Sequence, residues 1–256
     1  MDRLAFTSMS SINERRLLRE QLNNELANVS TIGFKRSFEN AMVSVKAAGE
    51  GFDTRIQPYI EKANAVNLEP GNLYATGRDL DIALLGTAVM GVQAPNGELA
   101  FTRRGDLRIG AQGVLENGSY HPILSEDGNI ITIPAGFETR ITNEGDIYAR
   151  NPAEPLEVAE VLIGRLFLRD ASEIVFMRRD DTLYSPQPEF RTPNGDFENG
   201  PNPPVVVPQA LESSNVSPVT AMVKLLDFTR SFESQVRVIK EAKSLDESGT
   251  SMLRPR

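Results

Sequence analysis

Residues 215–247 have the sequence NVSPVTAMVKLLDFTRSFESQVRVIKEAKSLDE, and this stretch decides the class of fold. Ser217 can cap a helix, and Pro218 suits the first helical position, where an N–H group would be unpaired anyway. Apolar residues then recur at steps of three and four, so they share one helical face, which Thr229 and Lys243 interrupt. We expect the helix to end near Gly249. The apolar face contains Met222, Leu225, Leu226, Phe232, Val236 and Ile239.

A second stretch of the same kind, residues 9–30, lies at the other end of the chain. Its apolar residues are Leu18, Leu22, Leu26 and Val29, and charged side chains cover the remaining faces. The pattern predicts a helix that starts at Ser11 or nearer residue 3 and ends near Gly33. A narrow apolar stripe buries too little surface to keep a lone helix folded in water. The two terminal helices are therefore expected to need each other and neighbouring molecules.

Between the two ends, the period of the apolar residues falls to about two. Asn96-Gly97 lies between two such runs and is the strongest hairpin signal in the chain. Short strands separated by turns at this spacing favour an antiparallel sandwich or a partly open barrel. The predicted fold class is α+β, with N- and C-terminal helices paired in a coiled-coil-like domain and a central antiparallel β-rich domain. Further turns are predicted at Asn117-Gly118, Asp127-Gly128 and Glu144-Gly145.

The same patterns predict the domain boundaries. Residues 1–33 and 211–256 are expected to form the terminal helical domain, and residues 76–192 the β-rich domain. A return linker rich in Pro and Gly is expected at 193–210. Residues 34–75 are a connecting segment, in which helical spacing is interrupted at Gly49-Glu50-Gly51. The residues with that helical spacing are Phe34, Phe38, Ala41, Met42 and Val45.

Composition argues against several classes of partner. The net charge of −8 argues against nucleic acid and anionic lipid, because both require a basic surface. No segment approaches the ~20 apolar residues of a membrane span, and the N-terminus lacks the pattern of a cleaved signal peptide. The chain has no cysteine, which removes disulfides, thiol catalysis and cysteine-ligated zinc.

We expect no catalytic, cofactor-binding or metal-binding residues, and no cofactor. His121 is the chain's one histidine, and the sequence predicts an ordinary turn or surface residue there. Paired arginines such as Arg103–Arg104 are expected to be solvated. The acidic pairs Asp79/Asp81 and Asp180/Asp181 are weak evidence for acid–base chemistry in a chain with 35 acidic residues. A protein that is not an enzyme is therefore expected.

Four blocks of sequence stand out along the chain. They are LANVSTIGFKRS (26–37), LYATGRDLDIAL (73–84), FTRRGDLRIGAQGVLENG (101–118) and LESSNVSPVTAMVKLL (211–226). In this order, they resemble the bacterial flagellar rod and hook proteins. The chain length and the compact β region are similar to those of rod subunits, with the proximal rod favoured over the distal rod. Residues that match the family's N- and C-terminal motifs are Ala27, Asn28, Gly33, Phe34, Lys35, Asn215 and Val216.

The resemblance implies a structural axial subunit of the flagellar basal-body rod. Such subunits pair their terminal helices into an inner tube with the β domain outside, forming the drive shaft and export channel. The implied partners are copies of the chain, other proximal and distal rod subunits, the flagellar type III export apparatus and the surrounding basal-body rings. The implied location is the basal body in the periplasmic space, reached without a cleaved signal peptide. The expected assembly interface consists of Leu18, Leu22, Leu26, Val29, Met222, Leu225, Leu226, Phe232, Val236 and Ile239.

Two alternatives remain open at this point. One is a distal-rod subunit of the same family. The other, from a different class, is a periplasmic peptidoglycan-binding or carbohydrate-active β protein. The lack of Trp and of an acid–base constellation argues against the second alternative.

Overall fold

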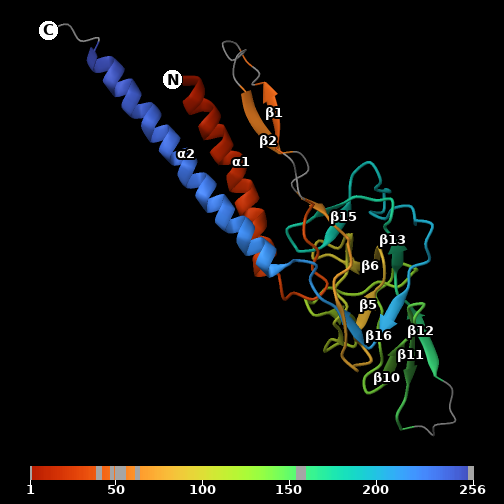
Figure 1. The fold of residues 1–256 in the computed structure, drawn as a ribbon. Helices are drawn as coiled ribbons and strands as arrows, with labels where there is room; N and C mark the ends of the chain where they lie inside the picture. Colours follow the sequence, from red (N-terminus) through yellow and green to blue (C-terminus); the bar gives the residue numbers. More distant parts are fainter. Residues whose placement is uncertain are drawn as a thin grey trace. The chain divides into compact units, whose positions relative to one another are not determined.

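The computed structural model describes residues 2–38, 42–46, 49, 56–60, 64–153 and 160–252. The chain forms two compact units (Figure 1). The helical unit contains residues 1–27, 37–63 and 217–256, and the β unit contains residues 28–36 and 64–216. The sequence-based boundaries also covered residues 1, 39–41, 47–48, 50–55, 61–63, 154–159 and 253–256, which lie outside the described residues.

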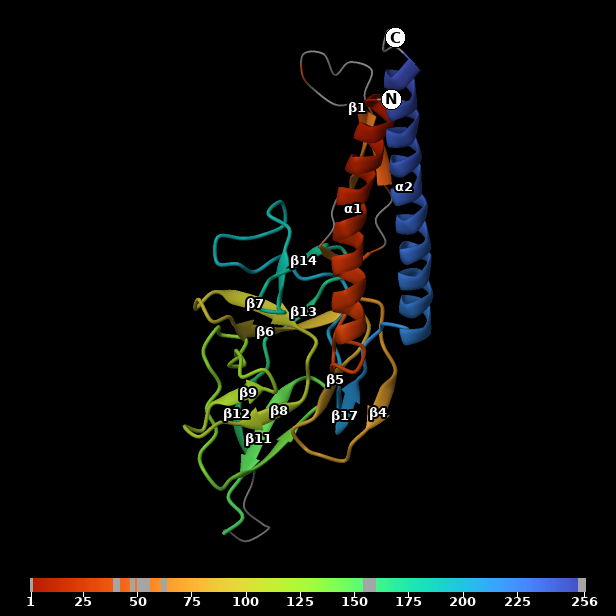
Figure 2. The same cartoon turned by 90° about the vertical axis from the view of Figure 1, so that its left-hand side faces the viewer.

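The helical unit is built on two helices, α1 (Asp2–Ala27) and α2 (Pro218–Met252). They lie side by side and antiparallel, so the start of α1 and the end of α2 are at the same end of this unit (Figures 1 and 2). A hairpin of β1 (Met42–Lys46) and β2 (Ile56–Ile60) belongs to the same unit. The Thr7 hydroxyl of α1 donates to the Ile56 carbonyl at 3.3 Å, which ties β2 to α1.

Two hydrogen bonds mark the side of α2 that faces α1. Gln235 Nε2 donates to Ser11 Oγ at 2.9 Å, and the Arg15 guanidinium donates to Ser231 Oγ. Residues of α2 on this side are buried or half-buried and follow a seven-residue repeat. They are Ala221, Leu225, Phe228, Gln235, Ile239 and Ala242.

The sequence pattern predicted two sets of seam positions on α2. The first set, Leu225, Phe232 and Ile239, coincides with the observed repeat, although Phe232 is exposed. The second set, Met222, Thr229, Val236 and Lys243, lies one residue later than the observed positions, and only Val236 in it is half-buried. The small side chains of Ala221 and Ala242 allow close approach, so they are buried in place of Met222 and Lys243.

The helix ends also differ from some of the predictions. α1 starts at Asp2, which agrees with the earlier of the two predicted starts, and Ser11 lies inside the helix. α2 continues through Gly249 to Met252, so the prediction that Gly249 ends the helix was wrong. A single glycine costs a helix only about 1 kcal/mol, which is too little to terminate one of this length.

Every strand pair in the β unit is antiparallel. A six-stranded sheet has the order β13-β6-β7-β15-β14-β3, a three-stranded sheet has the order β10-β11-β12, and three pairs complete the unit: β16-β5, β17-β4 and β8-β9. The strands are β3 (Ala65–Val66), β4 (Leu73–Ala75), β5 (Ile82–Leu84), β6 (Ala88–Gln93), β7 (Leu99–Thr102), β8 (Leu107–Ile109), β9 (Leu115–Asn117), β10 (Glu138–Ile141), β11 (Asp146–Arg150), β12 (Val161–Arg165), β13 (Leu168–Asp170), β14 (Phe176–Arg178), β15 (Tyr184–Pro186), β16 (Val206–Pro208) and β17 (Ala210–Glu212).

Three of the four predicted turn glycines have a positive φ, and Gly118 does not. Gly97 joins β6 to β7 with φ +83°, and Gly145 joins β10 to β11 with φ +86°. Both angles lie in the left-handed region that favours glycine. The segment predicted as a return linker, 193–210, includes β16, which pairs with β5. The whole segment belongs to the β unit, and Phe197 within it is part of the buried core.

Two buried apolar clusters form the core of the β unit. The larger cluster contains Ile82, Met90, Leu107 and Ile123 among others. The smaller one is aromatic: Phe101 packs edge-on against Phe176 and Phe197, with ring centroids 5.5 and 5.0 Å apart. This core supports the polar site described next.

Candidate functional site

Three segments that are distant in sequence converge inside the β unit. Residues 28–36 follow α1 and residues 67–72 precede β4. Residues 212–216 begin with the last residue of β17 and lead to α2. The Gly33 N–H donates to the Glu212 carbonyl at 2.8 Å, and the Asn67 N–H donates to the Arg36 carbonyl at 2.9 Å. These hydrogen bonds therefore hold together the segments through which the chain leaves α1 and enters α2.

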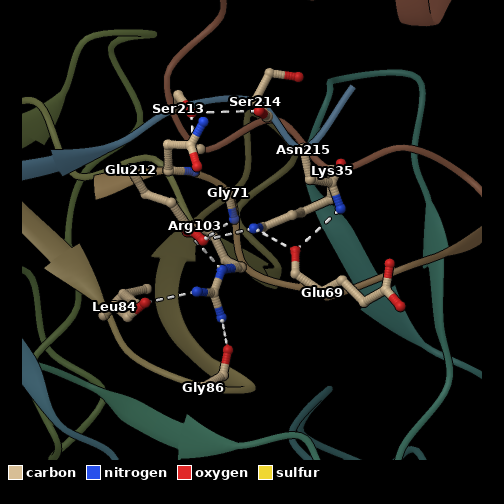
Figure 3. A network of polar contacts seen from close by, with 12 residues as sticks. Lys35, Glu69, Gly71, Leu84, Gly86, Arg103, Glu212, Ser213, Ser214 and Asn215 are labelled. Carbon is tan, nitrogen blue, oxygen red and sulfur yellow. Dashed lines mark hydrogen bonds and ion pairs between the residues drawn. The ribbon is translucent and has the colours of Figure 1, made fainter. Parts of the chain in front are cut away.

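A fully buried ion triad lies at this place (Figure 3). One carboxylate oxygen of Glu212 accepts from Lys35 Nζ at 2.7 Å, and the other accepts from Arg103 Nε at 2.9 Å. All three side chains have 0% exposure. Gly71 N–H also donates to Glu212 at 2.8 Å. One glutamate thus ties residues 35, 71 and 103 to β17.

The triad contains two cations and one anion, so it carries an excess positive charge in the core. Backbone carbonyls compensate this charge. Arg103 donates to the carbonyls of Leu84, Gly86 and Ala88 at 2.6 to 2.8 Å, and Lys35 donates to that of Glu69 at 2.9 Å. Buried ions are tolerated only when paired and hydrogen-bonded in this way.

Burial is the main cause that lowers the pKa of Lys35, and repulsion from Arg103 adds to it, giving a pKa of about 8. The attraction and hydrogen bond of Glu212 oppose this effect. A lysine with such a pKa can serve as a base or nucleophile. Here its ammonium group is inaccessible to solvent and donates to Glu212 and Glu69, so the geometry indicates a structural role.

Residues of both family-like motifs meet around the triad. Asn215 Oδ1 accepts from the Arg36 N–H at 2.6 Å, while its Nδ2 donates to the carbonyls of Asn67 and Glu69, each at 3.0 Å. Phe34 is buried beneath the Arg178 guanidinium, 4.3 Å from the ring centroid. Asn28 closes a turn with Thr31, and Val216 is buried. Ala27 is the last residue of α1.

Gly33 is required by both its backbone conformation and its surroundings. Its φ is +66°, and an added Cβ would lie 2.3 Å from the Arg103 carbonyl oxygen. The Tyr184 hydroxyl, fully buried, donates to the Gly33 carbonyl at 3.4 Å. The predicted turn at Gly33 is confirmed, and it places residue 33 directly against the backbone of Arg103, a member of the triad.

Replacing Gly33 by alanine is expected to lower the free energy of unfolding by about 3 kcal/mol. The loss has two sources: alanine is strained in the left-handed backbone conformation, and its Cβ would clash with the Arg103 carbonyl oxygen. Gly128→Ala is the matched control, because Gly128 has φ +79° with nothing within 4 Å of an added Cβ. The control should cost only about 1 kcal/mol, from strain alone. Urea unfolding of both variants measures the difference, and equal losses would show that the Gly33 contact is unimportant.

The triad also predicts a pH dependence of stability. Between pH 8 and about 9.5, folded Lys35 releases its proton while an unfolded lysine, with a pKa near 10.5, retains it. The unfolded state then binds more protons, so the free energy of unfolding should rise with pH, by up to ~1.4 kcal/mol per pH unit. Lys35→Met should remove this rise. Urea unfolding of both proteins at pH 7.5, 8.5 and 9.5 tests it, and parallel pH profiles would contradict it.

The structure places the sequence-predicted interface residues in different surroundings. Leu18, Leu22 and Leu26 are half-buried and continue the α1 face that begins with Ser11 and Arg15, the residues bonded to α2. Val29 belongs to the β unit. On α2, Leu225, Val236 and Ile239 are half-buried, whereas Met222, Leu226 and Phe232 are exposed.

One prediction about polar residues was wrong. Arg103 was expected to be solvated but is fully buried, because Glu212 and three carbonyls satisfy its guanidinium. His121, expected to be a turn or surface residue, lies at the end of the 117–121 turn, where its N–H donates to Asn117 Oδ1 at 3.0 Å. It is 9% exposed, and burial lowers its pKa. The sequence reasoning missed Arg103 and Glu212 as members of this site, and Lys35 was noted only as part of a motif.

Three of the four residues in the acidic pairs Asp79/Asp81 and Asp180/Asp181 have hydrogen-bond or ion-pair partners. Asp79 accepts from Gln209, Asp81 pairs with Arg78 at 3.1 Å, and Asp181 pairs with Arg179 at 3.1 Å. Within the described part of the chain, no group of three or more His, Asp or Glu residues is arranged to hold a metal ion. In the same residues, no helix has the length and apolarity needed to cross a bilayer.

Comparison with known proteins identifies the family to which this chain belongs. Residues 207–252 match the family described as flagellar basal body rod FlgEFG protein C-terminal. The flagellar basal-body rod protein FlgF of Salmonella typhimurium is 33% identical over 248 residues, covering 97% of this chain and 96% of that protein. FlgF of Escherichia coli is 31% identical, with 93% of each chain covered. A FlgG rod protein of Buchnera aphidicola from Schizaphis graminum is 25% identical over 257 residues. With nearly its full length aligned to two FlgF proteins, this chain belongs to the family of flagellar basal-body rod proteins.

Proposed function

We propose that this structural rod subunit works by self-assembly through α1 and α2, which pair as a coiled coil and pack against neighbouring subunits to form the inner tube of the rod. The β unit is proposed as the outer sleeve. In this arrangement, the subunit contributes to the torque-transmitting shaft and to the wall of the export channel. It acts by assembly and not by turnover of a substrate.

The observation that carries the proposal is a second apolar face on α2. Val219, Met222, Val223 and Leu226 are 71%, 54%, 51% and 59% exposed. At 100° per residue they lie together on the side of the helix opposite Ala221, Phe228 and Gln235. Clustered exposed apolar residues of this kind indicate a protein–protein interface. One face of α2 thus packs against α1, and the opposite face is available for contact with a neighbouring subunit.

The ion triad supports the mechanical part of the proposal. The chain passes between the two units at residues 27–28, 36–37, 63–64 and 216–217. Residues 28–36 and 213–216, which adjoin three of these places, are held inside the β unit by hydrogen bonds that involve Lys35, Glu212 and Asn215. Firm anchoring of these segments in the β unit suits a subunit that transmits torque.

The partners proposed are copies of the chain, proximal and distal rod subunits, the flagellar type III export apparatus and the basal-body rings. The proposed location is the periplasmic part of the basal body. The near-full-length similarity to FlgF proteins supports a proximal position over a distal one.

Deletion of the gene tests the proposal. The deletion strain should lack flagella beyond an incomplete rod and should not swim, and the wild-type gene should restore both properties. Mass spectrometry of basal bodies purified from the restored strain should detect the chain. Normal swimming of the deletion strain would refute the proposed role.

A further inference from the structure

Four polar side chains lie where α1 and α2 face each other. Gln235 Nε2 donates to Ser11 Oγ at 2.9 Å, and the Arg15 guanidinium donates to Ser231 Oγ. Each helix thus contributes a serine and, four residues later, a longer side chain with an N–H donor. Each donor bonds to the serine of the other helix. These four residues form a polar layer in the seam between the two helices.

The polar layer is shielded from solvent. Its four residues are half-buried. Two of its atoms, Arg15 Nε and Gln235 Oε1, are buried and have no hydrogen-bond partner among the described residues. The first is a donor and the second an acceptor, so the remaining hydrogen-bonding groups of the layer are complementary. Buried polar groups destabilise a fold when they face apolar neighbours, so the alignment of this layer matters.

Apolar side chains flank the polar layer along the seam. Apolar burial is not directional, so these side chains pack against one another about as well when one helix shifts along the other by a heptad. They therefore contribute little to the choice between such alignments. They are Leu18, Leu22 and Leu26 on α1, and Leu225, Phe228, Ile239 and Ala242 on α2.

The connection to the β unit does not fix the alignment by itself. Residues 28–32 join the end of α1 to Gly33, whose N–H is bonded to the Glu212 carbonyl. Five extended residues span up to about 17 Å. A shift of one heptad moves a helix by about 10 Å along its axis. This connection alone therefore allows such a shift.

We propose that the polar layer fixes the register of α1 along α2. This inference rests on the proposed pairing of the two helices. In the observed register, each donor meets a serine. A shift by one heptad in one direction places Leu18 opposite Gln235, and a shift in the other direction places Arg15 opposite Lys224. The first brings an apolar side chain against a polar one, and the second brings two cations together. Polar seam residues are known to set register in this way.

The register determines how far α2 extends beyond α1. With Ser11 opposite Gln235, Asp2 lies opposite residue 244. The end of α2, up to Met252, therefore extends beyond the start of α1 (Figure 2). This end carries Leu245, which is 63% exposed. A shift of one heptad would change the length of this end by about 10 Å, and so change what it presents to a neighbouring subunit.

Disulfide cross-linking measures the register directly, because the chain has no cysteine of its own. Leu22→Cys combined with Leu225→Cys should form a disulfide in the observed register. Leu22→Cys combined with Phe232→Cys should form one only after a shift of one heptad, because Phe232 lies seven residues further along α2. Both pairs are oxidised in the full-length subunit and in purified basal bodies, and the cross-linked fraction is measured by mass spectrometry of peptides.

Replacing Arg15 and Gln235 together by leucine should raise the shifted fraction about tenfold, because the hydrogen bonds that distinguish the registers are lost. Arg16→Leu with Ser234→Leu is the matched control, since both residues are exposed outside the polar layer, and it should leave the shifted fraction unchanged. Arg15→Gln with Gln235→Arg exchanges the two donors and should retain the observed register. Far-UV circular dichroism establishes that each variant keeps its helices. If the leucine variant does not, Arg15→Ala with Gln235→Ala takes its place with the same expectation.

Two results would overturn the proposal, and they differ in what they say of the helix pairing. Equal shifted fractions in the leucine variant and in its control would show that the polar layer does not set the register, while the pairing of α1 with α2 would stand. No disulfide in either register, in the free subunit and in basal bodies alike, would show that the helices are not paired. That result would refute the proposed pairing and the register together.

Discussion

Replacing Glu212 by glutamine is expected to lower the free energy of unfolding of the β unit by about 3–5 kcal/mol, the typical loss when one partner of a buried ion pair is removed. The variant leaves Lys35 and Arg103 fully buried without the carboxylate that now pairs with both, at 2.7 and 2.9 Å. The glutamine side chain has an oxygen that accepts and a nitrogen that donates. It therefore offers an acceptor to only one of Lys35 and Arg103 in the present geometry. A domain of this size is stable by only about 5–15 kcal/mol, so much of its stability is lost.

Urea unfolding followed by near-UV circular dichroism measures this loss. The chain lacks Trp, and four of its five tyrosines lie in the β unit, so the signal reports mainly on that unit. Lys35→Met is the informative comparison, because it leaves a balanced Arg103–Glu212 pair and should cost less. Glu69→Gln is the surface control: Glu69 pairs with Arg36 at 3.2 Å with its side chain 67% exposed, so the change should cost under about 1 kcal/mol. Equal losses in all three variants would contradict the central role of Glu212.

Replacing Leu226 by aspartate is expected to abolish swimming while leaving the isolated subunit folded. Leu226 is 59% exposed, so the folded chain should lose under about 0.5 kcal/mol. In an assembly that covers this face, the substitution removes about 2 kcal/mol of association free energy per subunit, because the apolar side chain is no longer buried. It also buries a carboxylate, which costs several kcal/mol more. The loss recurs at every contact along the rod. Swimming in soft agar and electron microscopy of purified basal bodies measure the effect.

Ser234→Asp is the matched control for Leu226→Asp. It introduces the same charge at an exposed polar position further along the same helix. It should support normal swimming, which separates the effect of the apolar face from that of an added charge or of reduced helix propensity. Normal motility and intact rods in the Leu226→Asp strain would show that this face of α2 is not an assembly contact.

Local sequence signals predicted much of the fold. Asn-Gly and Glu-Gly pairs located the turns at residues 96–97 and 144–145, because few other residues adopt positive φ values at low cost. Ser217-Pro218 located the start of α2, where Ser217 Oγ accepts from the Thr220 N–H at 3.3 Å. These predictions held because the interactions that determine them span only a few residues.

The ion triad could not be predicted in the same way. Glu212 lies 177 residues from Lys35 and 109 residues from Arg103, and a single sequence contains no signal that pairs them. Adjacent arginines such as Arg103 and Arg104 are usually solvated, so the burial of Arg103 was missed. One of the two predicted sets of seam positions on α2 was displaced by one residue, because Met222 and Leu226 belong to a second apolar face that periodicity alone did not separate from the first.

The sequence motifs identified the family correctly. The residues of these motifs are concentrated where the chain enters and leaves the β unit. Gly33, Lys35 and Asn215 each contact the triad or the segments around it. The sequence identified these residues as a pattern, and the structure gives their physical reason. Gly33 fits against the Arg103 carbonyl, Lys35 pairs with Glu212, and Asn215 joins three segments through its amide.

Electron cryo-microscopy of basal bodies containing this subunit with a small tag tests the rod assignment most directly. The tag is best inserted between Asp127 and Gly128, at an exposed turn where an added Cβ at Gly128 has nothing within 4 Å. The account predicts tag density in a ring around the rod, at the height of the proximal segment, with paired helices lining the channel at the same height. A complete rod without tag density, in a strain that expresses the tagged subunit as its only copy, would contradict it.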